Sequence, residues 1–263
     1  MPNDQTISAI LDDLIRTHQS RLSANDRAFL RRVFSTDPEL YRTRLRALGF
    51  VGLRRVLDAG CGFGQWSLAL AQLNDRVASV DANAARIRLL DDILQRTATG
   101  NVEARAGRLE QLPYADGSFD AAFCYIALFY CDWRAALGEL VRVLRPGGRL
   151  YVTGNGIGWY LHLWFNRPNA TSDYEPREIV ARTFADTVEY ERSGRPPNGQ
   201  LIIEPAGLAT ALEASGLAVL ARGAEGTIHA DQSAPPPRPF FEASYFGQVG
   251  CYEILAQKQE RPR

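Results

Sequence analysis

Lysine is almost absent from the 263-residue chain, because Lys258 is the only lysine among 30 basic residues. Chemistry that needs a lysine amine, such as Schiff-base formation or a phosphate-binding P-loop, is therefore almost excluded. The 30 acidic residues balance the basic ones, so the formal net charge is zero. Proteins that bind DNA or RNA without sequence preference usually carry a positive excess, and we therefore expect no nucleic-acid partner.

Patterns that bind metals or cross membranes are missing as well. The 4 cysteines form no CxxC pair, and His18, His162 and His229 lie too far apart in the sequence for a local metal site. No stretch reaches about 18 apolar residues. The N-terminus also lacks the basic start and apolar core of a signal peptide. We therefore predict no metal, no membrane span and a cytoplasmic location with reduced thiols.

The first 50 residues predict helices. One apolar face at helical spacing is formed by Ile7, Ile10, Leu11, Leu14 and Ile15. Ser23 or Asn25 caps a second helix, and Asp37 followed by Pro38 starts a third that ends near Gly49.

From Arg54 onward, short apolar runs alternate with helical stretches. The predicted strands cover residues 54–60, 76–82, 102–107, 119–128, 148–154, 217–226 and 248–258. The predicted helices between them cover residues 65–73, 85–96, 133–144 and 204–216. This alternation predicts βαβ units and a parallel sheet. Residues 145–148, which read RPGG, predict a helix stop and a turn before the fifth strand.

Residues 155–204 break the alternation and are interpreted as an insertion after the fifth strand. They begin with the aromatic residues Trp159, Tyr160, Trp164 and Phe165, and continue with a helix from about Pro176 to Tyr190. A proline cluster between Pro235 and Pro239 marks the loop before the last strand.

The sharpest motif is VLDAGCGFGQWS, residues 56–67, in which a strand leads through a glycine loop into a helix. Glycines at positions 60, 62 and 64 allow a tight turn and let a ligand approach the backbone. Gln65 stands where a dinucleotide fingerprint would have glycine, which disfavours a pyrophosphate on the helix terminus. Asp81 ends the second strand, 21 residues after Gly60. A carboxylate there is placed to accept both hydroxyls of a ribose.

These motifs, together with LPYADGSFD (residues 112–120) and LRPGGRLYV (residues 144–152), resemble the class I S-adenosylmethionine-dependent methyltransferases. The resemblance is close over residues 54–155 and loose over 205–257. It implies an α/β, Rossmann-like, mostly parallel seven-stranded sheet with helices on both faces. It also implies a helical lid over residues 1–50 and a methyltransferase domain over 51–263, with the 155–204 insertion on the substrate side.

The cofactor implied by the resemblance is S-adenosylmethionine. The residues that it assigns to cofactor binding are Asp58, Gly60, Gly62, Gln65, Trp66, Asp81, Ala82, Arg108, Leu109 and Tyr125. Among them, Asp81 would hold the ribose, and Asp58 would order the loop or bind the ammonium group through water. Arg108 departs from the family pattern, because an arginine cannot accept a hydrogen bond from the adenine amine. Either the backbone then makes that contact, or Arg108 stacks on the ring or faces solvent.

Candidate catalytic residues are His162, which follows the fifth strand, and Tyr125, at the end of the fourth. His162 has an alternative reading as a packed structural histidine. His229 is a weaker candidate base, and His18 is expected at the surface or in the lid. The aromatic residues of the insertion, together with Phe29, Phe34 and Tyr41, either line an acceptor pocket or pack on the sheet.

The leading hypothesis is a methyltransferase acting on an oxygen, nitrogen or carbon atom of a small molecule. The arginine- and alanine-rich composition suggests a bacterial source, in secondary or cell-envelope metabolism. One alternative is a tRNA or protein methyltransferase, and another is a non-catalytic cofactor-binding regulatory protein. We expect the acceptor between the N-terminal helices and the 155–204 insertion, because ligands of open α/β sheets bind beyond the carboxyl ends of the strands.

Overall fold

The computed structural model describes residues 4–260, so the first three residues of the predicted lid lie outside it. The N-terminal helices begin where the sequence predicts. They are α1 (Asp4–His18), α2 (Ala24–Ser35) and α3 (Pro38–Ala47), with a short 3-10 turn, η1 (Gln19–Arg21), after the first. Ser23 caps α2 in a reciprocal capping box with Asp26, and Asp37 caps α3. Each cap satisfies an otherwise unpaired amide of a first turn.

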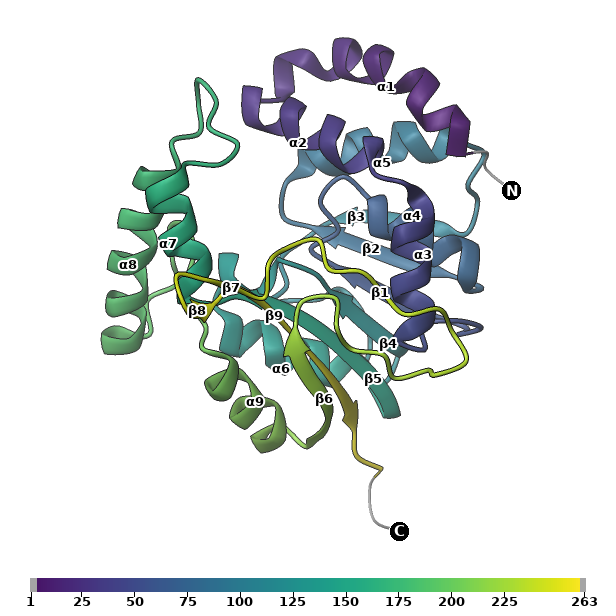
Figure 1. Ribbon diagram of the computed structural model, residues 1–263. Coiled ribbons are helices and arrows are strands. Elements are labelled where there is room, and N and C mark those ends of the chain that lie inside the picture. The colour runs from purple at the N-terminus through teal and green to yellow at the C-terminus, as the bar shows by residue number, and fades with distance from the viewer. Residues whose placement is uncertain (1–3, 261–263) are drawn as a thin grey trace.

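A seven-stranded sheet forms the centre of residues 4–260 (Figure 1). Its strands are β1 (Val56–Ala59), β2 (Val77–Asp81), β3 (Val102–Ala106), β4 (Phe119–Cys124), β5 (Leu144–Asn155), β6 (Leu217–Ala224) and β9 (Cys251–Lys258). The order is β3-β2-β1-β4-β5-β9-β6, and β9 runs antiparallel to the other six of these described strands. The predicted fold class is therefore confirmed.

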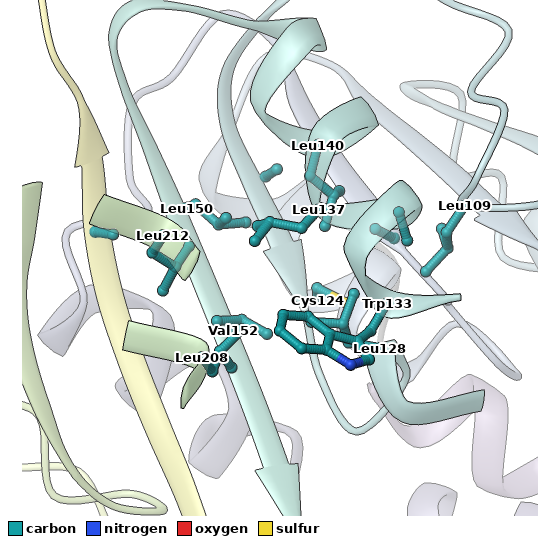
Figure 2. Close-up of a cluster of buried hydrophobic side chains, with 14 of the residues drawn as sticks. Leu109, Cys124, Leu128, Trp133, Leu137, Leu140, Leu150, Val152, Leu208 and Leu212 are labelled. Atoms are coloured by element: carbon teal, nitrogen blue, oxygen red, sulfur yellow. The ribbon is translucent and has the colours of Figure 1, made fainter. Parts of the chain in front are cut away.

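Helices cover both faces of the sheet. On one face lie α3, α4 (Gln65–Leu73) and α5 (Ala84–Arg96), and on the other lie α6 (Trp133–Val143) and α9 (Pro205–Ala214). Figure 2 shows part of the core beneath α6 and α9, where Trp133 packs close to Cys124 and Leu128. On the opposite face, Phe50, Phe123 and Tyr151 are fully buried. Burial of this apolar surface is the main source of stability.

Three predicted boundaries shift for local reasons. The fourth strand ends at Cys124, not at residue 128, because Ile126 takes a positive φ of 52° and leaves the strand. Residues 145–148 lie within β5 but bulge, since the pairing jumps from Phe119↔Leu144 to Ala121↔Arg149. The last predicted strand is divided at Gly250. Its first residues pair in a hairpin of β7 (Ser244–Tyr245) and β8 (Gln248–Val249).

The 155–204 insertion contains two helices. The predicted helix is present as α8 (Pro176–Ser193). The aromatic stretch before it also folds as a helix, α7 (Ile157–Asn166), which packs on α8 and on the β7–β8 hairpin. Figure 1 shows the connection between α7 and α8 extending toward α2, on the same side of the molecule as α1.

Candidate cofactor and acceptor site

The glycine loop between β1 and α4 needs glycine for different reasons at different positions. Gly60, Gly62 and Gly64 all have positive φ values, of 75°, 57° and 86°. A Cβ at Gly60 would lie 2.2 Å from the Cβ of Ala127, so the loop packs directly on the segment after β4. A Cβ at Gly62 would meet no atom within 4 Å. The loop is therefore open at Gly62, as close approach by a ligand requires.

Asp58 lies beneath this loop and is almost completely buried. The hydroxyl of Ser67 donates to its carboxylate at 2.6 Å, and the hydroxyl of Ser79 donates to that of Ser67 at 2.9 Å. Burial raises the pKa of Asp58 to about 7, aided by the negative charge of Asp81 and opposed by the Ser67 hydrogen bond. The carboxylate ties β1, β2 and α4 together under the loop.

Asp81 connects the glycine loop to the end of β2. Its two carboxylate oxygens accept hydrogen bonds from the amides of Gly62 and Asn83, at 2.9 and 2.8 Å. Each oxygen keeps a further lone pair, so the carboxylate can still accept from a ligand hydroxyl. The structure thus brings together the loop and the carboxylate that the sequence assigns to the cofactor.

The residues predicted near the adenine lie at the ends of β2 and β3. Ala82 is exposed, and Leu109 is buried about 4.0 Å from the Cβ position of Gly60. Arg108 pairs with Glu110, and its side chain is 68% exposed. Of the alternatives for Arg108, the structure therefore shows the solvent-facing one.

Gln65 and Trp66 do not face the open side of the loop. Trp66 is 2% exposed and packs on the rings of Tyr41, Phe123 and Tyr125. Gln65 helps line a small cavity beside α3 with Tyr41, and its side-chain oxygen is buried without a partner among the described residues. The first turn of α4 directs both side chains toward α3, so the prediction that they contact the cofactor does not fit this arrangement.

The side chain of Tyr125 is held in position by a buried ionic network and not by contacts with the glycine loop. Its hydroxyl donates to Glu225 at 2.7 Å, and Glu225 forms an ion pair with Arg44 of α3. Burial raises the pKa of Tyr125 far above its usual value, and the nearby Glu225 raises it further. A catalytic role for this hydroxyl, which the sequence suggested, does not fit because its proton is already donated to a buried carboxylate.

In the sequence, Glu225 is only a charged residue at the end of an apolar strand, and nothing in the pattern indicates a structural role for it. In the structure it is 1% exposed and accepts hydrogen bonds from three groups. Besides Tyr125 and Arg44, the amide of Phe240 donates to it at 2.8 Å. It therefore holds the proline-rich loop after β6 against α3.

His162 lies on α7 against the β7–β8 hairpin. Its ring stacks on Tyr245, with centroids 4.3 Å apart, and lies 5.5 Å from that of Trp159. Burial lowers the pKa of His162, so the imidazole is neutral at pH 7. Its Nδ1 is buried without a partner among the described residues. These contacts are compatible with both alternatives for His162, a structural residue in a packed aromatic cluster and a base.

The other histidines have local partners. His229 hydrogen-bonds the carbonyl of Ala234 at 2.8 Å, within its own loop. His18 is buried at the end of α1 and pairs with Asp92 of α5 at 3.2 Å, so of the two positions expected for it the structure shows the lid and not the surface. Neither of these side-chain contacts reaches the glycine loop, since the partner of His229 is Ala234 and that of His18 is Asp92.

The aromatic candidates divide between core and surface. Tyr160 and Tyr41 are buried, whereas Trp164 and Phe165 are 41% and 61% exposed. Phe29 of α2 lies 5.8 Å from Phe63 of the glycine loop, measured between ring centroids. Helix α2 therefore covers this loop, as a lid would.

The lid and the insertion touch each other through the α7–α8 connection. The carboxylate of Asp173 accepts hydrogen bonds from the amides of Ala24 and Asn25, at 2.6 and 2.9 Å, and so caps α2 from outside. About two turns further along α2, Arg32 donates to the side-chain oxygen of Asn169 at 3.0 Å. Two segments that are more than 100 residues apart in the sequence therefore meet over the same side of the glycine loop.

Within residues 4–260, no group of three or more histidine, cysteine, aspartate or glutamate side chains is arranged to hold a metal ion. The same range contains no helix long and apolar enough to cross a membrane.

Comparisons with known proteins agree with the fold and the loop. Residues 57–152 match the model of a family described as a methyltransferase domain. The methyltransferase match therefore concerns residues 57–152, and over these residues the resemblance of the motifs to the class I S-adenosylmethionine-dependent methyltransferases is confirmed. S-adenosylmethionine is the cofactor of this class.

Named relatives match less than half of this chain. A malonyl-[acyl-carrier protein] O-methyltransferase of Dechloromonas aromatica is 41% identical over 101 residues, or 38% of this chain and 36% of the relative. An uncharacterized methyltransferase of Bacillus subtilis, YcgJ, is 36% identical over 99 residues, or 37% of this chain and 39% of the relative. The chain thus spans less than half the length of these curated relatives.

Solved structures share the fold more widely. The [4+2]-cyclase SpnF has a TM-score of 0.59 at 20% identity, covering 85% of this chain and 81% of that one. A sarcosine dimethylglycine methyltransferase from Galdieria sulphuraria, whose assignment is provisional, has a TM-score of 0.58 at 14% identity, covering 89% of each chain. At these identities the likeness concerns the fold alone.

Proposed function

We propose that this protein transfers the methyl group of S-adenosylmethionine to a small-molecule acceptor. The observation that carries the proposal is the junction of the open glycine loop with Asp81, whose carboxylate holds the amide of Gly62 at 2.9 Å. This junction lies at the carboxyl ends of β1 and β2, where open α/β sheets bind their ligands. At the neighbouring Gly62, an added Cβ would meet no atom within 4 Å, so the backbone there is open to the approach of a ligand.

The residues present fit that cofactor. Asp81 would accept hydrogen bonds from the ribose hydroxyls, and Gly60 and Gly62 would border the methionine part. The cofactor supplies a methyl group that is already activated by the positive charge on sulfur. The protein's own contribution is then to hold the acceptor in line and to exclude water, and positioning alone is worth about 7–11 kcal/mol in favourable cases.

The acceptor site belongs, in this proposal, between α2 and the α7–α8 connection. The contacts of Asp173 and Asn169 with α2 support it, because they close one side of the space beyond the strand ends. Helices α2 and α7 carry aromatic residues, Phe29 on α2 and the exposed Trp164 and Phe165 on α7, which suits a site that must be dry around the reacting atom. We also propose a bacterial and cytoplasmic setting, since the two relatives described are bacterial and Cys61, Cys124, Cys131 and Cys251 are free thiols.

The test is transfer of radiolabelled methyl from S-adenosylmethionine into three separate fractions: low-molecular-weight metabolites, tRNA and protein. We expect label in the first fraction and binding of S-adenosylhomocysteine by calorimetry. Label in tRNA or protein would support the alternative substrates instead. Cofactor binding with no transfer into any fraction would favour the regulatory reading, which stays relevant because a cyclase shares this fold.

A further inference from the structure

The segment after β4 carries backbone strain next to the glycine loop. Ile126 has a φ of 52°, a left-handed conformation that β-branched residues rarely adopt. Its amide donates to the hydroxyl of Thr153, at the end of β5, at 2.7 Å. The next residue, Ala127, is the one that contacts Gly60. Such strain costs about 1–3 kcal/mol and persists where the surroundings enforce it, often at functional sites.

The strained segment leads into the short 3-10 helix η2 (Leu128–Tyr130), which presents one tyrosine outward. Leu128 and Phe129 are each 1% exposed and anchor the turn in the core, whereas Tyr130 is 55% exposed. The amide of Leu201 donates to the carbonyl of Phe129 at 2.8 Å. The end of the insertion is thereby fixed to η2.

A buried glutamine holds the hydroxyl of this exposed tyrosine. Gln200 is 9% exposed, and its side-chain nitrogen donates to the oxygen of Tyr130 at 3.0 Å. Its side-chain oxygen accepts from the hydroxyl of Tyr160 at 3.3 Å. A surface tyrosine normally samples several rotamers, so this buried amide fixes the direction of the Tyr130 ring.

Tyr130 retains its own proton for another partner. Its oxygen already accepts from Gln200, and residues 4–260 offer its proton no acceptor in this arrangement. Desolvation raises the pKa of Tyr130 to about 12, so the phenol is neutral at pH 7. Tyr130 lies in the segment after the carboxyl end of β4, which packs on the glycine loop through Ala127.

We propose that the hydroxyl of Tyr130 donates a hydrogen bond to an oxygen atom of the methyl acceptor, and that Gln200 is the positioning residue for this contact. The proposal rests on the proposed function. It names the substrate class more closely, as a molecule with a carboxylate, phenolate or carbonyl oxygen at or beside the methylated atom. A neutral phenol donor favours such an oxygen, most of all when it is charged.

The test compares three variants with the unchanged protein. The probe is a low-molecular-weight metabolite extract, titrated in the labelled-methyl assay, and S-adenosylhomocysteine affinity is measured in parallel. Tyr130→Phe should raise the apparent KM for the extract by about 10- to 100-fold, as loss of a hydrogen bond to a charged group would. The cofactor affinity should change less than twofold. Tyr114→Phe is the matched control, because it removes a buried tyrosine hydroxyl that has no partner among the described residues.

The third variant, Gln200→Leu, tests positioning. As a single change, Gln200→Leu should raise the apparent KM for the extract. In the Tyr130→Phe background it should cause no further rise in KM, because both changes remove the same contact. Additive losses would show that Gln200 acts only on stability and would overturn its role. A Tyr130→Phe protein with unchanged KM, or with cofactor affinity reduced as much as transfer, would overturn the role of Tyr130. If the unchanged protein labels no small molecule, the proposed function itself is wrong, and this inference falls with it.

Discussion

Asp81 has two tasks at once, because its carboxylate orders the glycine loop and is the proposed partner of the ribose. We predict that Asp81→Ala weakens S-adenosylmethionine binding by about 1.5–3 kcal/mol, the range for a hydrogen bond to a charged group. Calorimetry measures this directly. Asp116→Ala, which removes a side chain that is 81% exposed, is the control and should bind normally. Equal affinity in the two variants would remove Asp81 from the site.

Asp58 should make stability depend on pH. Its pKa is about 7 in the folded protein and about 3.9 in an unfolded chain, so the folded state binds more protons between these values. Its contribution to stability is therefore fully present below about pH 4 and is lost as pH rises to about 7.

Asp58→Asn should remove this dependence. We predict that the variant gains about 2–4 kcal/mol relative to the unchanged protein between pH 4 and pH 8. Urea denaturation at a series of pH values measures the difference. A gap that stays constant across the range would show that Asp58 is ionised in the fold throughout.

At the scale of single residues, the motif predicts where the backbone runs better than where side chains point. Gly60, Gly62 and Asp81 meet as predicted, because their spacing follows from the strand–loop–helix path. Trp66 and Tyr125 do not, because their directions depend on α3 and on Glu225. Those partners lie far away in the sequence, and no local pattern indicates them.

The contact between the α7–α8 connection and α2 depends mainly on Asp173. Desolvation raises the pKa of Asp173, but hydrogen bonds from Thr171 and from the amides of Ala24 and Asn25 outweigh it, so the pKa lies below its usual value and the carboxylate is ionised at neutral pH. We predict that Asp173→Ala weakens this cap, because the amides of Ala24 and Asn25 lose their acceptor. Amide hydrogen exchange should then speed up in residues 167–175 and in the first turn of α2.

The control for Asp173 is Glu178→Ala, an exposed carboxylate in the first turn of α8. It should leave exchange in α2 unchanged. Faster exchange in both variants would mean that any loss of charge loosens the insertion, and that Asp173 does not tie the two segments specifically.

Secondary elements were predictable where periodicity was regular. The strands of the βαβ core and α8 follow from it, whereas α7 does not, because its run of aromatic residues shows no clear polar face. The β7–β8 hairpin is also absent from the pattern. It forms where Gly250 packs against the carbonyl of Glu242, a close approach that only the assembled loop reveals.

For the whole molecule, the buried ion pair of Arg44 and Glu225 fastens the N-terminal helical layer to the proline-rich loop. Both side chains are about 1% exposed, and Arg44 also lies over the ring of Phe240. We predict that Glu225→Ala lowers the free energy of unfolding by about 3–5 kcal/mol, because it leaves a buried charge without its partner. Denaturant unfolding measures this loss.

A double variant separates charge from packing. Arg44→Met combined with Glu225→Leu should recover most of the stability, since apolar pairs often replace buried ion pairs without loss. If the double variant is as unstable as the single one, the hydrogen bonds to Tyr125 and Phe240 matter more than the pairing of charges.

The position of β9 between β5 and β6 constrains the order in which the chain can assemble. On a ribosome, β6 is complete before β9 has been made, yet β6 pairs with no other strand of the described sheet. The four strands β1 to β4 can pair with each other early, while β6 must wait with an unpaired edge. Such edges attract non-native pairing during synthesis. This half of the sheet should therefore depend on chaperones more than the half that carries the glycine loop.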